Sequence, residues 1–329
     1  MDFVKKHIQF GYVNARLRAS RALYLSDSTL NDLIDVKTVN AMTEILSNTA
    51  YSEYLKELQT RYSGTELINK VVLRRFTNKL EHIKGMVVLE KRHLLYVALG
   101  KYDVYNLKIL FLEHFKKEEY KSEYVWAGYN FNWPTLKKMR DVTDLKHLIN
   151  IVRDKGYYIS DDSKTYSDII EDIERSYYNN LKSLKYDCYE ELEVRSYIEK
   201  LIDHKNFDLA LRKTVFNYNL DYLEGGSIEK EKLTSHEFKT IEEVVSFFNV
   251  ENFCDETCGD ISWLEELYER KITDWVIHQA FTKPFSIIGV VGYIRRLDNE
   301  RRNIRSIAIS KGVMVPEEVK AKLIKEVEL

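Results

Sequence analysis

The chain has 329 residues, of which only 12 are glycine and 3 are proline. These two residues punctuate turns, and together they make up about 5% of the chain, against roughly 12% in an average protein. Such scarcity favours long helices, and 44% hydrophobic residues are enough for sizeable cores, which argues against a disordered chain. Fifty basic and 52 acidic residues leave a net charge of −2, so no strong field would attract nucleic acid or an anionic membrane surface.

Cysteine use and hydropathy indicate the compartment. The three cysteines, Cys188, Cys254 and Cys258, are too few and odd in number for a disulfide framework, which favours a reducing cytoplasm. The last two have no second ligand pair or nearby histidines, so we expect no zinc site. The N-terminus has no apolar core of a secretory signal, and the longest nearly apolar stretch, residues 285–294, is far shorter than the roughly 20 residues that span a bilayer. Any membrane connection is therefore expected to be peripheral.

Three candidate helix starts recur along the chain, 102 and 92 residues apart. In each, a hydroxyl residue that can cap a helix stands three positions before an acidic residue, and apolar residues follow at helical spacing. The pairs are Ser63 with Glu66, Thr165 with Asp168, and Thr257 with Asp260. We expect a long amphipathic helix after each, with apolar stripes over residues 73–87, 170–192 and 264–275, and a break near Pro284.

Each of these helices leads to a similar short signature, in which an acid stands three residues before an asparagine and a basic residue follows. A fourth, degenerate copy near the N-terminus lacks the acid. The four asparagines are separated by 92, 100 and 97 residues. The copies comprise Asn14, Arg16 and Arg18; Asp103, Asn106 and Lys108; Asp203, Asn206 and Arg212; and Glu300, Asn303 and Arg305.

Turn signals follow the signatures at corresponding places: Gly128 with Pro134, Gly225 with Gly226, and Gly312 with Pro316. We expect further short helices over residues 39–46, 145–152 and 241–248. The sequence therefore predicts an all-α protein of three helical repeat units, at residues 1–105, 106–206 and 207–329, the last with an additional C-terminal helix pair.

The signatures allow two interpretations. On a helix, an acid and an asparagine three residues apart share a face, so they could hydrogen-bond a neighbouring helix or turn and fix how the units join. Alternatively, the basic residues beside them point into a common space and contact an acidic partner. No glycine-rich phosphate loop and no H-E-x-x-H pattern occurs, so we expect no catalytic residue, cofactor, metal or small-molecule substrate.

Several ordered blocks resemble the C subunit of prokaryotic V-type/A-type ATPases, the counterpart of the d subunit of eukaryotic V-ATPases. The resemblance extends from about residue 5 to 325. It departs most in the third unit, where Asp208 stands at a position that is usually basic in the family. This departure argues against a contact role for position 208, although Arg212 follows one turn later. The blocks are residues 12–19, 50–55 and 103–108, and 300–305 with Lys311, Gly312 and Pro316 to Glu318.

The resemblance implies three similar helical domains about a pseudo-threefold axis, which form a funnel. It implies a non-catalytic coupling piece of a rotary motor that transports H⁺ or Na⁺. The closed end would sit on the membrane rotor ring of proteolipid subunits, and the cavity would receive the tip of the central shaft, made of the D and F subunits. A contact with the stator membrane subunit is a further expectation. The protein would then lie at the cytoplasmic face of the cell membrane, held there through the ATPase complex, and would bind no nucleic acid.

Two other classes stay open from the residues alone. One is an α-helical repeat adaptor that binds peptide or nucleic acid on a concave surface, although a period of about 95 residues is two or three times that of common solenoids. The other is an enzyme with a site inside a helical bundle, which would need a convergent cluster of His, Asp or Glu residues. The sequence shows no such cluster.

Overall fold

The computed structural model describes residues 2–118, 125, 127–186, 191–217, 221–250 and 261–312. Within these ranges the chain is helical and forms no strand, apart from one isolated bridge between Ala127 and Asn132. The all-α prediction is confirmed. None of the described helices is both long and apolar enough to cross a bilayer.

Long helices form most of the structure and contain most of the buried residues. The break predicted near Pro284 is confirmed, because one long helix ends at Thr282 and the next begins at Ile288. The predicted stripe over residues 73–87 is also buried in full, at Leu73, Phe76, Leu80, Ile83 and Val87. The long helices are α1 (Asp2–Ala19), α5 (Gly64–Met86), α6 (Tyr96–Lys116), α9 (Tyr166–Lys182), α10 (Glu191–Phe216), α13 (Ile261–Thr282) and α14 (Ile288–Ser310).

Short helices connect the long ones, and local caps determine where they begin. The Thr38 side chain accepts a hydrogen bond from Ala41, and Thr240 accepts one from Glu243. The three short helices that we predicted are present as α3, α8 and α12. The short elements are α2 (Asp27–Asp35), α3 (Val39–Ser47), α4 (Ser52–Leu58), α7 (Trp133–Arg140), α8 (Leu145–Asp154), α11 (Lys230–Ser235), α12 (Ile241–Phe247) and the 3-10 segments η1 (Ser20–Leu23) and η2 (Leu89–Leu95).

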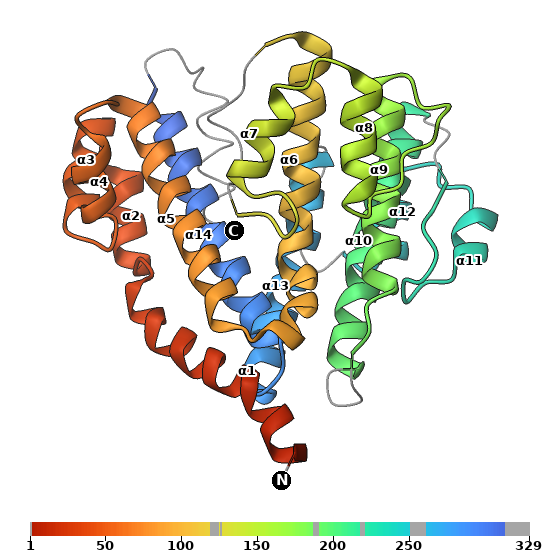
Figure 1. Cartoon of the computed structure of the whole chain (residues 1–329), viewed down its shortest axis with the longest axis horizontal. Helices are drawn as coiled ribbons and strands as arrows, with labels where there is room; N and C mark the ends of the chain where they lie inside the picture. Colours follow the sequence, from red (N-terminus) through yellow and green to blue (C-terminus); the bar gives the residue numbers. More distant parts are fainter. Residues whose placement is uncertain are drawn as a thin grey trace.

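The long helices reverse direction at one end of the molecule. Figure 1 shows them converging toward the region of α1, whereas the short helices spread over the broader, opposite part. The reversals between α5 and α6, α9 and α10, and α13 and α14 meet at the narrow end: a ring nitrogen of His93 lies 2.8 Å from the carbonyl oxygen of Lys185, and Lys283 forms a 3.0 Å ion pair with Glu193. We refer to this region as the narrow end.

We divide the helices into three groups for description, although α14 packs against α13 as well as α5, and α9 also packs against α10. In the second group α6 packs against α7 and α9, and in the third α10 packs against α12 and α13. The first group consists of α2 to α5 together with α14, which packs against α5 and α2 although it comes last in the described chain. The predicted domain boundaries place α14 in the third unit, and that division stays a prediction.

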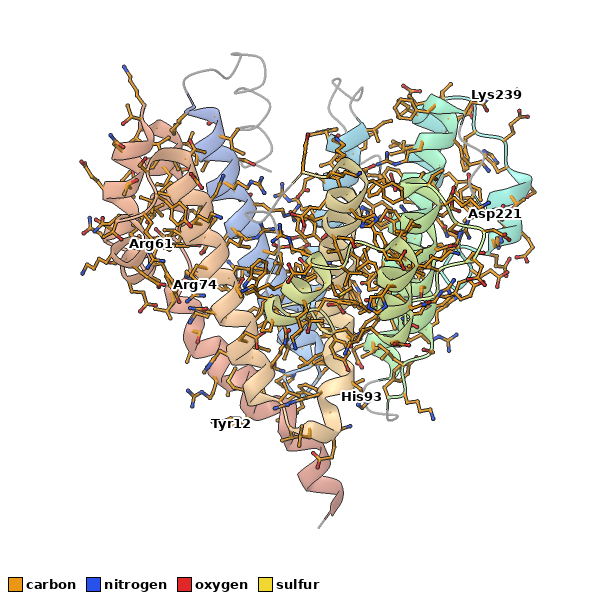
Figure 2. All side chains as sticks on the ribbon, turned by 45° about the horizontal axis from the view of Figure 1, so that its top comes forward. Tyr12, Arg61, Arg74, His93, Asp221 and Lys239 are labelled. Carbon is orange, nitrogen blue, oxygen red and sulfur yellow. The ribbon has the colours of Figure 1, made fainter. Side chains whose placement is uncertain are left out.

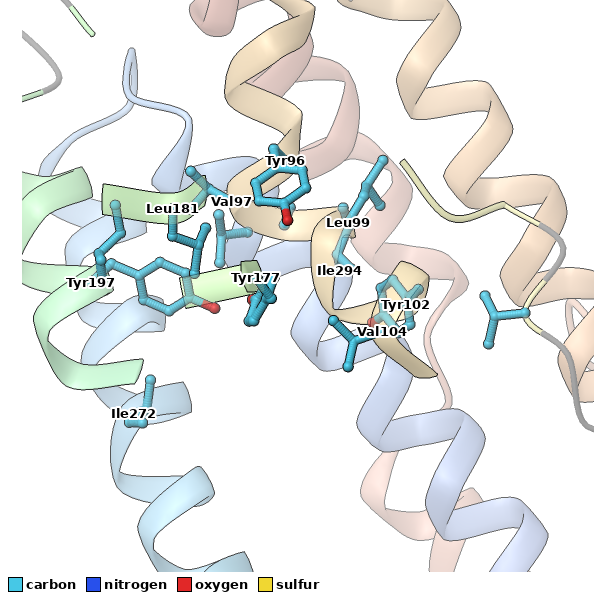
Figure 3. Close-up of a cluster of buried hydrophobic side chains, with 14 of the residues drawn as sticks. Tyr96, Val97, Leu99, Tyr102, Val104, Tyr177, Leu181, Tyr197, Ile272 and Ile294 are labelled. Carbon is cyan, nitrogen blue, oxygen red and sulfur yellow. The ribbon is translucent and has the colours of Figure 1, made fainter. Parts of the chain in front are cut away.

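Two apolar clusters make up the core. The larger extends through α6, α9, α10 and α13, and Figure 3 shows part of it around Tyr96, Tyr177, Tyr197 and Ile272. The smaller lies within the first helix group, where α14 contributes Ile304, Ile307 and Ala308. The first group therefore has a core of its own, which α14 completes.

Some details of the prediction are wrong. The stripe that we expected to continue from residue 170 to 192 is interrupted, because α9 ends at Lys182 and the chain reverses into α10, which leaves Leu192 72% exposed. Thr165 and Asp168 form the expected capping box, but Ser63 makes no side-chain cap although α5 begins beside it. The start at Thr257, all three cysteines and Pro316 lie outside the described residues.

Candidate functional site

The signature of the second helix group binds the turn that precedes α7. The Asp103 carboxylate accepts hydrogen bonds from the backbone N–H groups of Asn130 (2.8 Å) and Phe131 (3.1 Å). One helical turn later, the Asn106 amide donates to the carbonyl oxygen of Val125 (2.6 Å) and accepts from its N–H (2.8 Å). Both side chains are fully buried. We call such an acid and asparagine, with the turn that they hydrogen-bond, a signature contact.

The third helix group repeats this geometry. Asp203 accepts from the backbone N–H groups of Ser227 (3.1 Å) and Ile228 (3.3 Å). Asn206 donates to the carbonyl oxygen of Leu223 (3.0 Å) and accepts from its N–H (2.8 Å). The same pair of side chains therefore satisfies the same kind of buried backbone groups in both places, which would otherwise cost free energy.

Glycines allow the close approach of side chain and turn. A Cβ atom at Gly128 would overlap the Asp103 carboxylate, and one at Gly226 would overlap that of Asp203. Gly128 and Gly226 are thus needed for space rather than for a positive φ angle, whereas Gly225, beside the latter, has a φ of 95°.

The degenerate signature on α1 binds the turn before α14. The Asn14 amide donates to the carbonyl oxygens of Pro284 (2.9 Å) and Ser286 (2.8 Å). Here too a glycine makes room, because a Cβ at Gly289 would overlap the Asn14 side chain. Asn14 therefore fixes α1 to the start of α14.

The last signature differs, because it joins the two ends of the described chain. Glu300 of α14 accepts from the backbone N–H of Leu25 (2.8 Å), which begins the turn before α2, and from the Tyr51 hydroxyl (2.6 Å). It also forms a 2.7 Å ion pair with Arg75 of α5, and both side chains are buried. Asn303, half-buried, lines a groove of about 510 Å³ between α2, α13 and α14.

Burial and neighbouring charges shift the pKa values of these groups. Burial raises the pKa of Asp103 to about 7, against the opposing effect of the two N–H groups that it accepts from. Burial and the Glu300 carboxylate raise the pKa of Tyr51 well above its usual range, so this hydroxyl stays protonated and can donate.

The basic residues of the signatures lie in different surroundings. Lys108 forms an ion pair with Glu174 of α9, and Arg212 pairs with Asp208 and, at 2.9 Å, with Glu265 of α13. Asp208 thus contributes to a local ion-pair cluster. Arg305 is half-buried in the last part of α14.

The basic residues on α1 lie elsewhere. Arg16 is exposed, and Arg18 donates to the carbonyl oxygen of Ala280 (3.0 Å). These two lie toward the narrow end, whereas Lys108, Arg212 and Arg305 all occupy the second half of their helices, away from it.

A further set of ion pairs, which the sequence analysis did not identify, connects α6, α13 and α14. Burial opposes ionisation of Asp298, but Arg301 and Lys101 outweigh it and hold the pKa of that carboxyl well below its usual range. The pairs are Lys101 with Asp298 (3.3 Å), Arg301 with Asp298 (2.7 Å), Arg295 with Glu269 (2.9 Å) and Arg302 with Glu266 (2.8 Å). We call this set the ion-pair band.

Arg75 was not predicted from the sequence either. Its signal is an arginine in the middle of an apolar helical face, beside Val71, Val72 and Phe76, all of which are buried.

Among the described residues, no group of three or more His, Cys, Asp and Glu side chains could hold a metal ion.

The sequence is similar to those of known proteins over most of its length. A relative in Haloferax volcanii, named as the C subunit of an A-type ATP synthase, is 23% identical over 95% of this chain and 97% of its own length. A protein of the same name in Pyrococcus furiosus is 24% identical over 99% of this chain and 92% of its own length. Another, in Methanocaldococcus jannaschii, is 23% identical over 96% of this chain and 86% of its own length. The sequence profile of the ATP synthase (C/AC39) subunit family matches residues 13–321. The chain therefore belongs to the ATP synthase (C/AC39) subunit family, and it is an accessory, non-catalytic part of a rotary ATPase.

Proposed function

We propose that this protein couples the central shaft of a rotary ATPase to its membrane rotor ring. In this proposal the narrow end sits on the ring of proteolipid subunits, and the broad end receives the tip of the shaft, made of the D and F subunits. The three helix groups form a funnel about a pseudo-threefold axis, at the cytoplasmic face of the membrane. Torque from ATP hydrolysis passes through the protein and drives transport of H⁺ or Na⁺.

The observation that carries the proposal is the set of exposed apolar side chains at the narrow end. Leu89, Leu192 and Phe281 lie in or beside the three reversals there and are 73%, 72% and 65% exposed. Several large apolar side chains exposed at one end of a molecule favour a contact with another protein or a membrane. A protein ring suits this surface, because the narrow end offers several separate apolar contacts.

The opposite half of the molecule supports a shaft socket. Lys108 on α6 and Arg305 on α14 each stand two residues after the signature asparagine, whereas Arg212 on α10 lies one helical turn further along, because Asp208 occupies the corresponding position. A tip with acidic side chains could meet one cation from each helix group. An isolated charged contact of this kind contributes on the order of 1–3 kcal/mol only where it is shielded from water.

The buried contacts suit a part that transmits torque. The signature contacts fix three turns to the long helices, and the ion-pair band links α6, α13 and α14 across group boundaries. Packed helices joined by satisfied polar contacts deform little, so rotation at one end reaches the other.

Ring binding tests the proposal directly. The double variant Leu89→Asp/Leu192→Asp, purified and mixed with isolated proteolipid ring in detergent, should bind the ring at least tenfold more weakly than the native protein. The matched control is Phe216→Asp, because this exposed residue lies at the other end of α10 from Leu192. Unchanged ring binding by the double variant would overturn the placement of the narrow end.

Charge reversal tests the socket half. Lys108→Glu combined with Arg305→Glu should weaken binding of the purified shaft proteins while ring binding stays intact. Unchanged shaft affinity and intact coupling of ATP hydrolysis to ion transport would exclude these side chains from the socket.

A further inference from the structure

A groove runs between α1 and the end of α5, and neither the signature contacts nor the proposed ring surface uses it. Its volume is about 620 Å³, and its lining includes Tyr12, Arg16, Ala19 and Leu23 on one side and His82 and Met86 on the other. Figure 2 places Tyr12 at the edge of the molecule, far from Lys239 at the opposite corner. The groove therefore opens on the outer flank, near the narrow end.

The lining combines apolar walls with positive charge. Leu23 and Met86 provide apolar surface, and Leu23 remains 44% exposed. Arg16 donates to the Tyr12 hydroxyl (3.2 Å), and its guanidinium lies 5.9 Å from the centre of that ring. These two contacts hold the cation on the rim of the groove. None of the described residues that line the groove is acidic.

The apolar walls and the charge of the groove favour one kind of occupant. A helix with one apolar face, placed along a groove of this kind, buries that face against such walls. Acidic side chains on the flank of that helix would meet Arg16. This pairing is favourable because a guanidinium can form two parallel hydrogen bonds with one carboxylate. A basic helix would place like charges beside Arg16, which is unfavourable.

We propose that this groove binds an acidic amphipathic helix supplied by another protein of the same ATPase. The proposal rests on membership of the ATP synthase subunit family and not on the coupling of shaft to ring. Because one groove buries less than the roughly 1,200 Å² of a standard interface, this contact adds to a larger assembly rather than holding it alone. It should also weaken with salt, since Arg16 is exposed.

The test uses site-specific crosslinking in the complete, purified ATPase complex. A photoreactive phenylalanine analogue replaces Ala19, which is exposed in the groove, and a matched control replaces Lys239, which is exposed on the far side. Mass spectrometry should find a crosslink from position 19 to a segment of another protein of the complex that has acidic side chains beside an apolar face, and no such crosslink from position 239.

Charge variants then test the acidic character of the partner. Arg16→Glu should lower the yield of that crosslink by about tenfold, whereas Arg16→Lys should retain most of it, and the yield should fall with added salt. A crosslink to lipid alone, a crosslink to a segment without acidic residues, or no crosslink would each overturn the proposal. Retention of the proteolipid ring is measured on the same preparations. Loss of the ring with an intact crosslink would contradict the proposed coupling function and leave the groove assignment standing.

Discussion

The first and second helix groups form the same kind of contact, but the residues that make it are separated by very different distances along the sequence. In the second group, Asp103 binds the turn at Asn130 and Phe131, 27 and 28 residues away. In the first group, Glu300 binds the corresponding turn at Leu25, 275 residues away. The second group is therefore a local structure, whereas the first is completed only when the two ends of the described chain meet.

The two contacts also differ in chemistry. Among the described residues, Asp103 is surrounded by N–H groups and the hydroxyl of Tyr157 and forms no ion pair, and burial raises its pKa. Glu300 has an ion pair with Arg75 in addition to the hydroxyl of Tyr51. The long-range contact thus includes a charged partner that the local one lacks. Variants at each site show how much this partner contributes.

The largest effect is expected from Arg75→Met. Removing this cation leaves Glu300 buried without its counterion, which destabilises a protein by about 3–5 kcal/mol. Urea unfolding followed by circular dichroism measures the loss. The control is Arg74→Met, whose 3.6 Å ion pair with Glu57 is exposed and should contribute less than about 1 kcal/mol. Similar losses in both variants would show that the buried pair has no special role.

Asp103→Ala and Asp203→Ala should each cost somewhat less, about 2–4 kcal/mol, because each leaves two backbone N–H groups without an acceptor. Hydrogen exchange should accelerate at the amides of Asn130 and Phe131 in the first variant only. Asp162→Ala, in an exposed loop, serves as the control. Exchange that accelerates throughout the protein in Asp103→Ala would contradict a local second group.

The pH dependence of stability tests the raised pKa of Asp103. The pKa of Asp103 is raised from 3.8 to about 7, so between these values the folded state binds more protons than the unfolded state. The contribution of this group to stability is thus present at low pH and is lost as pH rises from about 4 to 7, with a slope of at most about 1.4 kcal/mol per pH unit. The difference in stability between the native protein and Asp103→Asn should follow this slope. A difference that does not change with pH would mean that Asp103 is ionised throughout.

Gly128→Ala and Gly226→Ala should give the smallest losses, about 1–3 kcal/mol, because the new methyl group would displace the acid from its turn. Gly85→Ala is the matched control: this helical glycine has open space around its Cα, so the substitution should stabilise α5 by about 0.5–1 kcal/mol. Thermal unfolding measures all three. Stabilisation by Gly128→Ala would show that Asp103 does not need the close approach.

Features that depend on neighbouring residues could be predicted from the sequence. The starts of α3, α8 and α12 follow from caps and apolar spacing within one or two turns, and the repeated signatures followed from counting along the chain. The end of α9 could not be predicted in this way, because the apolar spacing continues through residue 184 although the chain reverses. Only the packing of α10 against α9 and α13 requires a reversal there.

Contacts between residues far apart in the chain could not be predicted from the sequence. Nothing near Arg75 indicates that its counterion lies 225 residues away, and the ion-pair band connects helices whose order in space the periodicity does not give. The acids and asparagines of the signatures stand out along the chain, but their two interpretations could not be separated without knowing which turns lie opposite them. The socket role of the basic residues remains a prediction.

The late arrival of α14 has a consequence for biosynthesis. The end of α5 leaves the ribosome roughly 200 residues before the start of α14, which at about 5–20 residues per second means a delay of about 10–40 seconds. During that interval Ile68, Val71 and Val72 of the nascent chain lack the helix that covers them in the finished protein. A chaperone that shields apolar helices during translation would therefore act mainly on the first helix group. Codon changes that slow elongation after residue 86 should increase the dependence of folding on that chaperone.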